Sequence, residues 1–121
     1  MVIVIDFDNT IFEDNYPLVG ELLPNARDVI NRLYNDGDTI IISTCREGWA
    51  KENAIEALDM YGIKYHYFNE NDPDRIAKYN NDSRKIGGDI YIEDKDVHTL
   101  LCGINWANIE HKITKIKLRN A

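Results

Sequence analysis

The sequence has little of what marks secreted, membrane-spanning or nucleic-acid-binding proteins. It holds two cysteines in 121 residues, Cys45 and Cys102, which lie far apart without metal-ligand spacing. We therefore expect free thiols in a reducing, cytoplasmic setting rather than a disulfide. The apolar run of residues 1–5 is too short for a signal peptide or a membrane span, so we expect no membrane association.

Basic charge is also scarce. Lysine and arginine number 14 against 21 acids, which gives a net charge of -7 at pH 7. This balance argues against a general nucleic-acid binder, because phosphate backbones attract basic surfaces. It leaves open a nucleotide or a nucleic-acid end as substrate, since a metal ion supplies positive charge locally.

What the sequence does contain is an alternation of strand and helix patterns. With 44% hydrophobic and 29% charged residues, it has the composition of an ordinary globule, and its length suits one domain over residues 1–121. Apolar, β-branched or aromatic runs predict strands at residues 2–5, 39–43, 65–68 and 89–92. Helical periodicity and end signals predict helices at residues 24–36, 50–61, 73–79 and 106–116. Such alternation predicts an α/β fold, a three-layer α/β/α sandwich around a Rossmann-like parallel sheet.

Polar residues follow or precede these strands where a parallel sheet forms its ligand crevice. They are Asp6, Asp8 and Thr10 after the first strand, Thr44 after the second, Lys85 before the fourth, and Glu93 and Asp94 after it. Acids gathered at one edge repel one another, and a divalent cation such as Mg²⁺ removes that repulsion. An anion that bridges the metal, Lys85 and the Thr44 hydroxyl fits this set, which favours a phosphoryl group.

The run Asp6-Phe7-Asp8-Asn9-Thr10 matches the DxDxT signature, and the chain resembles the haloacid dehalogenase superfamily. Thr44 looks like the second motif of that superfamily, Lys85 like the third, and Glu93-Asp94 like the paired acids of the fourth. The motifs appear in order and resemble those of small phosphatase-like members. Asn9 stands where many members have glycine, and Glu93 where aspartate is more frequent.

The resemblance implies a Mg²⁺-dependent phosphomonoester hydrolase. Asp6 would be the nucleophile that forms an aspartyl-phosphate, and Asp8 would act as general acid and then as general base. Asp6, the Asp8 backbone carbonyl and Asp94 would hold Mg²⁺, with Glu93 as an outer partner.

The resemblance also implies roles in holding the phosphoryl group. Thr44 and Lys85 would bind its oxygens, and Thr10 would stabilise the loop and the phosphoaspartate. The sequence is also compatible with purely structural roles for Thr44 and Lys85. Thr44 is suited to cap the next helix, and Lys85 is suited to lie on the surface. Arg46 is a candidate for substrate recognition, with a surface ion pair to Glu47 as the alternative.

The superfamily's usual cap domain has no room in this chain. The segments between Thr10 and Pro24, and between the third strand and Lys85, are too short to fold separately. We therefore expect a capless, open site, unless Tyr16, Pro17 and Leu18 form a small flap or a second copy of the chain covers it. An open site suits a bulky phosphorylated substrate.

Two other functions stay open at this point. One is a nucleotide or polynucleotide-end phosphatase of the same superfamily, which would share every catalytic residue. The other is a phosphoacceptor or binding module with little turnover. Receiver domains are disfavoured, because their phosphorylated aspartate ends the third strand, and here that strand is followed by Asn69-Glu70.

Overall fold

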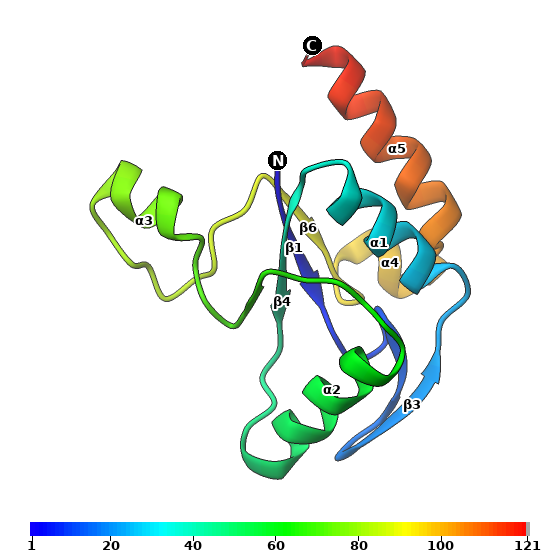
Figure 1. The fold of residues 1–121 in the computed structure, drawn as a ribbon. Coiled ribbons are helices and arrows are strands. Elements are labelled where there is room, and N and C mark those ends of the chain that lie inside the picture. Colours follow the sequence, from blue (N-terminus) through cyan, green and yellow to red (C-terminus); the bar gives the residue numbers. More distant parts are fainter. Residues whose placement is uncertain (121) are drawn as a thin grey trace.

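A four-stranded parallel sheet forms the centre of the molecule in the computed structural model, which describes residues 1–120 (Figure 1). The strand order is β5-β4-β1-β6. The strands are β1 (Val2–Asp6), β4 (Thr39–Ser43), β5 (Tyr67–Phe68) and β6 (Ile90–Ile92). All neighbours pair in parallel, from Val2 opposite Thr39 to Asp6 opposite Ser43 in the β1–β4 pair. The carboxyl ends of β1, β4 and β6 therefore meet at one edge.

The central strand β1 shows why the sequence folds this way. Ile3, Val4 and Ile5 are each at most 5% exposed, so side chains on both faces of the strand are buried. A strand covered on both faces needs a continuous apolar run rather than an alternating one. The prediction that the runs at residues 2–5 and 39–43 form buried parallel strands is confirmed, whereas β5 and β6 are parallel but only partly buried.

Helices flank this sheet and complete a three-layer, Rossmann-like α/β sandwich, as predicted. They are α1 (Ala26–Asn35), α2 (Gly48–Met60), α3 (Pro73–Tyr79), α4 (Val97–Cys102) and α5 (Trp106–Arg119). The last helix is anchored by Trp106, which is 1% exposed and donates from Nε1 to the Thr10 carbonyl at 2.7 Å. This bond ties the end of the fold to the loop that follows Asp6.

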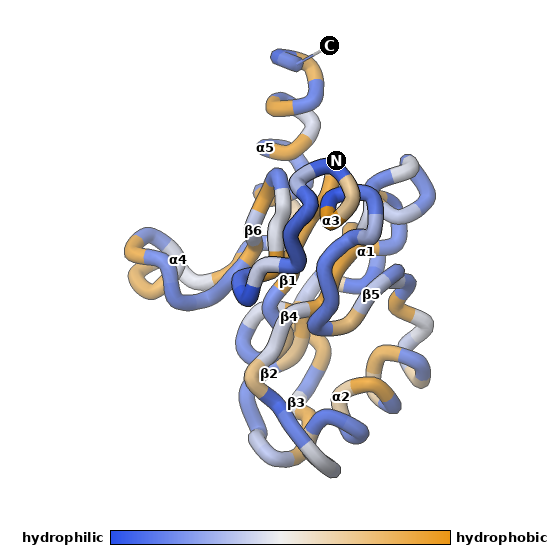
Figure 2. The backbone as a smooth tube through the Cα atoms, turned by 90° about the vertical axis from the view of Figure 1, so that its left-hand side faces the viewer, coloured by the Kyte–Doolittle hydropathy of each residue, from blue (hydrophilic) through white to orange (hydrophobic). Residues whose placement is uncertain are grey.

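Helix α4 was not predicted from the sequence. It begins at Asp96, whose carboxylate accepts from the backbone N–H groups of His98 and Thr99. Figure 2 shows it projecting from the rest of the molecule. The helices within residues 1–120 include none that is both long and apolar enough to cross a membrane.

A second, two-stranded antiparallel sheet was also missed. Strands β2 (Phe12–Asn15) and β3 (Leu18–Leu22) form a hairpin that lies between the end of β1 and α1. Its tip holds Tyr16 and Pro17, in the segment where the sequence left room for a small flap. No cap domain is present in the described residues, as expected, but this hairpin stands beside the carboxyl edge of the sheet.

Candidate functional site

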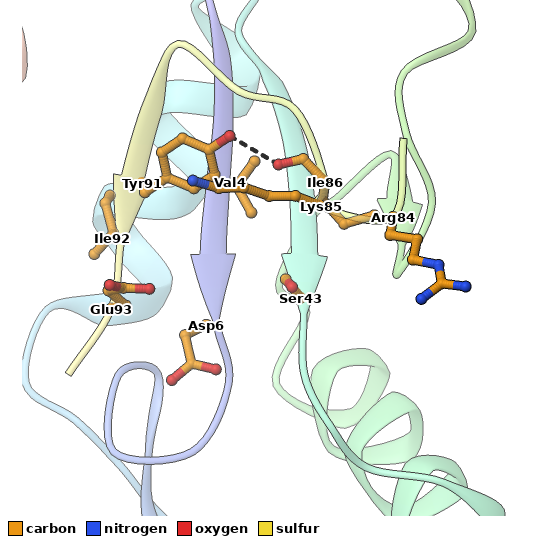
Figure 3. Close-up of a pocket in the computed structure, with 9 residues that line it drawn as sticks. All are labelled: Val4, Asp6, Ser43, Arg84, Lys85, Ile86, Tyr91, Ile92 and Glu93. Atoms are coloured by element: carbon orange, nitrogen blue, oxygen red, sulfur yellow. Dashed lines mark hydrogen bonds between the residues drawn. The ribbon is translucent and has the colours of Figure 1, made fainter. Parts of the chain in front are cut away.

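Asp6 lies at the carboxyl end of β1, where it lines two adjoining cavities of the sheet edge. One cavity, of about 270 Å³, is shared with Lys85, Tyr91 and Glu93 (Figure 3). The other, of about 260 Å³, is bounded by residues from four segments of the chain. Its lining is Asp6, Asp8, Asn9, Asp14, Tyr16, Thr44, Cys45, Arg46, Asp94 and Lys95. The structure thus gathers the predicted acids, Thr44 and Lys85 around the one carboxylate of Asp6.

Lys85 lies in the first cavity on the ring of Tyr91. Its ammonium is 4.8 Å from the ring centroid, and Figure 3 shows the side chain crossing above Val4 to reach it. The Tyr91 hydroxyl donates to the Ile86 carbonyl at 2.8 Å and accepts from the Gly88 N–H at 3.0 Å, so the ring is fixed. Thr44, by contrast, lines the second cavity, so the two predicted phosphoryl-binding side chains flank Asp6 from different sides.

The loop that carries Lys85 is held by a buried residue that sequence reasoning missed. Asn71 is 6% exposed, and its amide nitrogen donates to the Asp82 carboxylate at 2.9 Å and to the Ser83 carbonyl at 2.8 Å. Its amide oxygen accepts from the Gly87 N–H at 2.7 Å. One side chain therefore fixes both ends of the segment around Lys85. Asn71 lies in a polar stretch, and no local pattern distinguishes it there.

Asp6 and Asp94 meet in the second cavity. Burial raises the pKa of Asp6 from 3.8 to about 7, and the hydrogen bond to Asp94, the Asp94 charge and the Asp8 charge act in the same direction. The Phe7 backbone N–H, which donates to the Asp6 carboxylate, opposes that rise in pKa. Neighbouring carboxylates in a partly buried place favour a shared proton unless a cation takes its place.

Arg46 is the largest departure from the sequence-based expectation. Its side chain is 1% exposed and forms a two-pronged ion pair with Asp8. Nε donates to Asp8 Oδ2 at 2.9 Å, and Nη2 donates to Asp8 Oδ1 at 2.7 Å. Within the described residues Arg46 pairs with Asp8 and not with Glu47, so the alternative of a surface ion pair is wrong.

The remaining N–H groups of Arg46 are also used inside the protein. Nη1 donates to the carbonyls of Pro17 at 2.8 Å and Ala50 at 2.9 Å, and Nη2 donates to Leu18 at 2.7 Å. A guanidinium has five N–H donors, and these bonds together with the Asp8 pair engage all of them. None is left to contact a substrate, so the predicted recognition role does not fit the geometry. The Arg46–Asp8 ion pair could not be predicted from the sequence, because 38 residues separate its partners.

The two predicted threonines have different surroundings. Thr44 Oγ1 accepts from the Arg46 N–H at 3.2 Å, and the Thr44 N–H donates to Asn69 Oδ1 at 2.8 Å. Helix α2 has Glu47 at its N-cap, so Thr44 does not cap it. Thr10 is fully buried and lines neither cavity, and its hydroxyl has no hydrogen-bond partner within residues 1–120.

Asn9 has a backbone conformation that few residue types adopt. Its backbone has φ of 58°, in the left-handed region that glycine and asparagine adopt most readily. Its side-chain oxygen accepts from the Asp14 N–H at 3.0 Å, which ties the loop to β2.

The carboxylates around Asp6 do not by themselves form a complete metal site. Residues 1–120 contain no group of three or more His, Cys, Asp or Glu side chains arranged to hold a metal ion. Asp8 is engaged by Arg46, and Glu93 lines the first cavity while Asp94 lines the second. Of the other carboxylates in the second cavity, Asp14 accepts from the Tyr16 N–H at 3.0 Å, and Asp6 and Asp94 lie in contact with each other. Such a pair fits Mg²⁺, which takes one or two carboxylates with water and phosphate oxygens, better than a metal that needs a full protein cage.

The raised pKa of Asp6 predicts how the metal-free protein responds to pH. Folded Asp6 binds more protons than unfolded Asp6 between its ordinary pKa of 3.8 and about 7. Its contribution to stability is fully present below that window and is lost as pH rises through it. We expect the melting temperature of wild type in EDTA to fall over this window more than that of Asp6→Asn. Calorimetry across the window tests this, and parallel curves for the two proteins would contradict it.

A parallel sheet with an acidic site at its carboxyl edge defines the class of this chain, an α/β protein of Rossmann-like architecture. A solved structure from Bacteroides thetaiotaomicron, described as a conserved protein, is 32% identical in sequence to this chain, with a TM-score of 0.81. The match covers 95% of this chain and 90% of the other. The chain therefore belongs to the same family as this Bacteroides protein. A scan against protein-family models found no match, and a search of curated proteins found none either.

Proposed function

We propose that the chain is a Mg²⁺-dependent phosphomonoester hydrolase that uses Asp6 as its nucleophile. The observation that carries the proposal is the contact of Asp6 with Asp94 at the carboxyl edge of the sheet, in the second cavity beside Asp8. Asp6 also lines the first cavity, which it shares with Lys85. The resemblance of the DxDxT run to the haloacid dehalogenase superfamily points to the same chemistry. The description of the Bacteroides relative names no activity and adds nothing to this choice.

In this proposal the residues around Asp6 divide the steps of the reaction. Asp6 attacks phosphorus in line and carries the phosphoryl group as an aspartyl-phosphate, while the leaving oxygen departs with a proton from Asp8. Water, deprotonated by Asp8, then releases phosphate from Asp6. Thr44 and Lys85 bind phosphoryl oxygens from the two sides of Asp6, which requires the Lys85 ammonium to leave the ring of Tyr91.

Asp6 and Asp94 would hold Mg²⁺, with the Asp8 backbone carbonyl as a further ligand. When bound, the ion supplies positive charge that neutralises the two carboxylates and the incoming phosphoryl oxygens. Asp6 would then be ionised and able to attack phosphorus. Glu93 lines the first cavity with Lys85 and does not line the second, so it would not be a direct ligand.

The test is turnover of p-nitrophenyl phosphate by the purified chain with Mg²⁺ and with EDTA. We expect nitrophenol release only with the metal. Binding is measured separately, as a rise in melting temperature on adding Mg²⁺ that is lost in Asp94→Asn and kept in Asp59→Asn. Asp59 is an exposed acid on α2, outside both cavities, and serves as the matched control. Metal-independent turnover, or no stabilisation by any divalent cation, would overturn the proposal.

The exposure of the residues that line the two cavities indicates how large a substrate can reach Asp6. The hairpin β2–β3 contributes Asp14 and Tyr16 to the second cavity but leaves Tyr16 61% exposed. Lys85 and Tyr91, which line the first cavity, are both exposed. A substrate with a large leaving group therefore reaches Asp6 without a lid opening first. A screen of mono- and oligonucleotides beside sugar phosphates separates the polynucleotide-end alternative from a general phosphatase.

A further inference from the structure

The side chain that holds Asp8 is also the one that holds the hairpin. We propose that Arg46 is a positioning residue, which fixes the Asp8 carboxylate and clamps the β2–β3 hairpin beside the cavity. The inference deepens the proposed function and rests on it, because it assigns to Arg46 the orientation of the acid/base group. It assigns Arg46 no contact with the substrate.

The geometry of the Arg46–Asp8 ion pair supports the proposal that Arg46 fixes the Asp8 carboxylate. Nε and Nη2 approach the two oxygens of Asp8 at 2.9 and 2.7 Å, so the plane of the carboxylate is set by the plane of the guanidinium. Each carboxylate oxygen has a second lone-pair direction. Arg46 uses one on each oxygen, and Asp8, with its side chain 26% exposed, keeps the others for the cavity that it lines. The carboxylate is therefore held in place yet open to a substrate.

The orientation of Arg46 is itself fixed on every side. The Ala50 carbonyl in α2 accepts from Nη1 at 2.9 Å, and the Phe7 ring lies 5.1 Å from the guanidinium carbon. The main chain of Arg46 is anchored as well, since its N–H donates to Thr44 Oγ1. A buried side chain whose five N–H donors are all bonded within the protein is held in one conformation. Its two bonds to Asp8 therefore hold the Asp8 carboxylate in one orientation as well.

The hairpin tip is bound by the same guanidinium. Pro17 and Leu18 offer their carbonyls at 2.8 and 2.7 Å, and the Tyr16 ring lies 5.2 Å from the guanidinium carbon. Asp14 and Tyr16 of this hairpin line the cavity that contains Asp8. Loss of Arg46 would therefore free the acid/base group and the wall of the cavity together. A lysine keeps the charge but lacks the fork that makes these bonds.

The experiment compares Arg46→Lys with a matched control. Arg32 forms an equally two-pronged pair with Glu110, at 2.7 and 3.0 Å, between α1 and α5 and away from both cavities. We expect Arg46→Lys to lower kcat for p-nitrophenyl phosphate by about tenfold to a hundredfold with KM changed far less. Arg32→Lys is expected to keep the wild-type kcat. An unchanged kcat in folded Arg46→Lys overturns the inference and leaves the proposed function standing.

Hydrogen exchange supplies a readout that needs no activity. We expect the amides of β2 and β3 to exchange faster in Arg46→Gln than in wild type, while Arg32→Gln leaves them unchanged. If wild type shows no Asp6-dependent turnover, the proposed function fails. The exchange measurement alone then tests whether Arg46 holds the β2–β3 hairpin. An unchanged exchange rate in Arg46→Gln then overturns the role of Arg46 in holding the hairpin, and faster exchange confined to the hairpin supports that role.

Discussion

Asp6→Asn is expected to lower Mg²⁺-dependent release of nitrophenol by at least about 10³-fold, because an amide cannot attack phosphorus as a carboxylate does. Asparagine has the shape of aspartate, so the variant keeps the packing at the end of β1. It also removes the Asp6 carboxylate, which is repelled by the charges of Asp94 and Asp8. The metal-free variant should therefore be at least as stable as wild type at pH 8. Steady-state kinetics and thermal melting of the same preparations measure both effects.

The control for this variant is Asp59→Asn, which removes an equal charge far from the cavities. It should retain the activity of wild type. Acid quenching of wild type with a ³²P-labelled phosphomonoester should trap label on the protein, and peptide mapping should place it on Asp6. Turnover by Asp6→Asn at the wild-type rate, or label on another residue, would show that Asp6 is not the nucleophile.

Asp8→Asn is expected to lower turnover by about 10²- to 10⁴-fold, the usual contribution of a positioned acid or base. The loss should depend on the leaving group. Nitrophenolate departs with little help from an acid, so the first step survives better with p-nitrophenyl phosphate than with an alkyl phosphate. The second step needs Asp8 as base with either substrate. We therefore expect a burst of nitrophenol equal to the enzyme concentration, followed by slow release.

Rapid-mixing kinetics on p-nitrophenyl phosphate and an alkyl phosphate test this prediction. An asparagine accepts only one of the two hydrogen bonds that Arg46 donates to Asp8, so part of any loss reflects position rather than chemistry. Arg46→Lys separates these contributions, because it keeps the Asp8 carboxylate while disturbing its position. Equal losses on both substrates without a burst would count against Asp8 as the acid/base group.

Several elements of the fold were predictable because their signal is local. The run at residues 2–5 is apolar and β-branched, and β1 lies there as a buried strand. Pro73 and the periodicity after it predicted residues 73–79, which are α3. The hairpin was missed because Glu13, Asp14 and Asn15 in β2 are polar and exposed, so no alternation marks a strand. Its pairing depends on contacts with β3 and with Arg46, which no short window of sequence contains.

The candidate site divides in the same way. Asp6, Asp8, Thr44 and Asp94 were predicted as site residues because they follow recognisable strands, and Lys85 because it precedes one. Asn71, which holds the Lys85 loop, stands next to none. Arg46 was predicted to contact substrate or to lie in a surface ion pair, but it is buried. A charged residue in a sequence gives no indication that its side chain will be buried. The five bonds of Arg46 reach residues from 8 to 50, and only the folded chain brings them together.

By itself the sequence determined that Asp6 ends a buried strand and that acids, a hydroxyl and an amine meet it at one sheet edge. Hydrophobic periodicity is a local property, and parallel strands place their carboxyl ends together whatever the details of packing. Only the tertiary structure decided how those groups are arranged around Asp6. Lys85 lies on one side with Tyr91, and Asp94 lies on the other side. Asp8 is held by Arg46, because a buried guanidinium must find partners for all its donors wherever the chain supplies them.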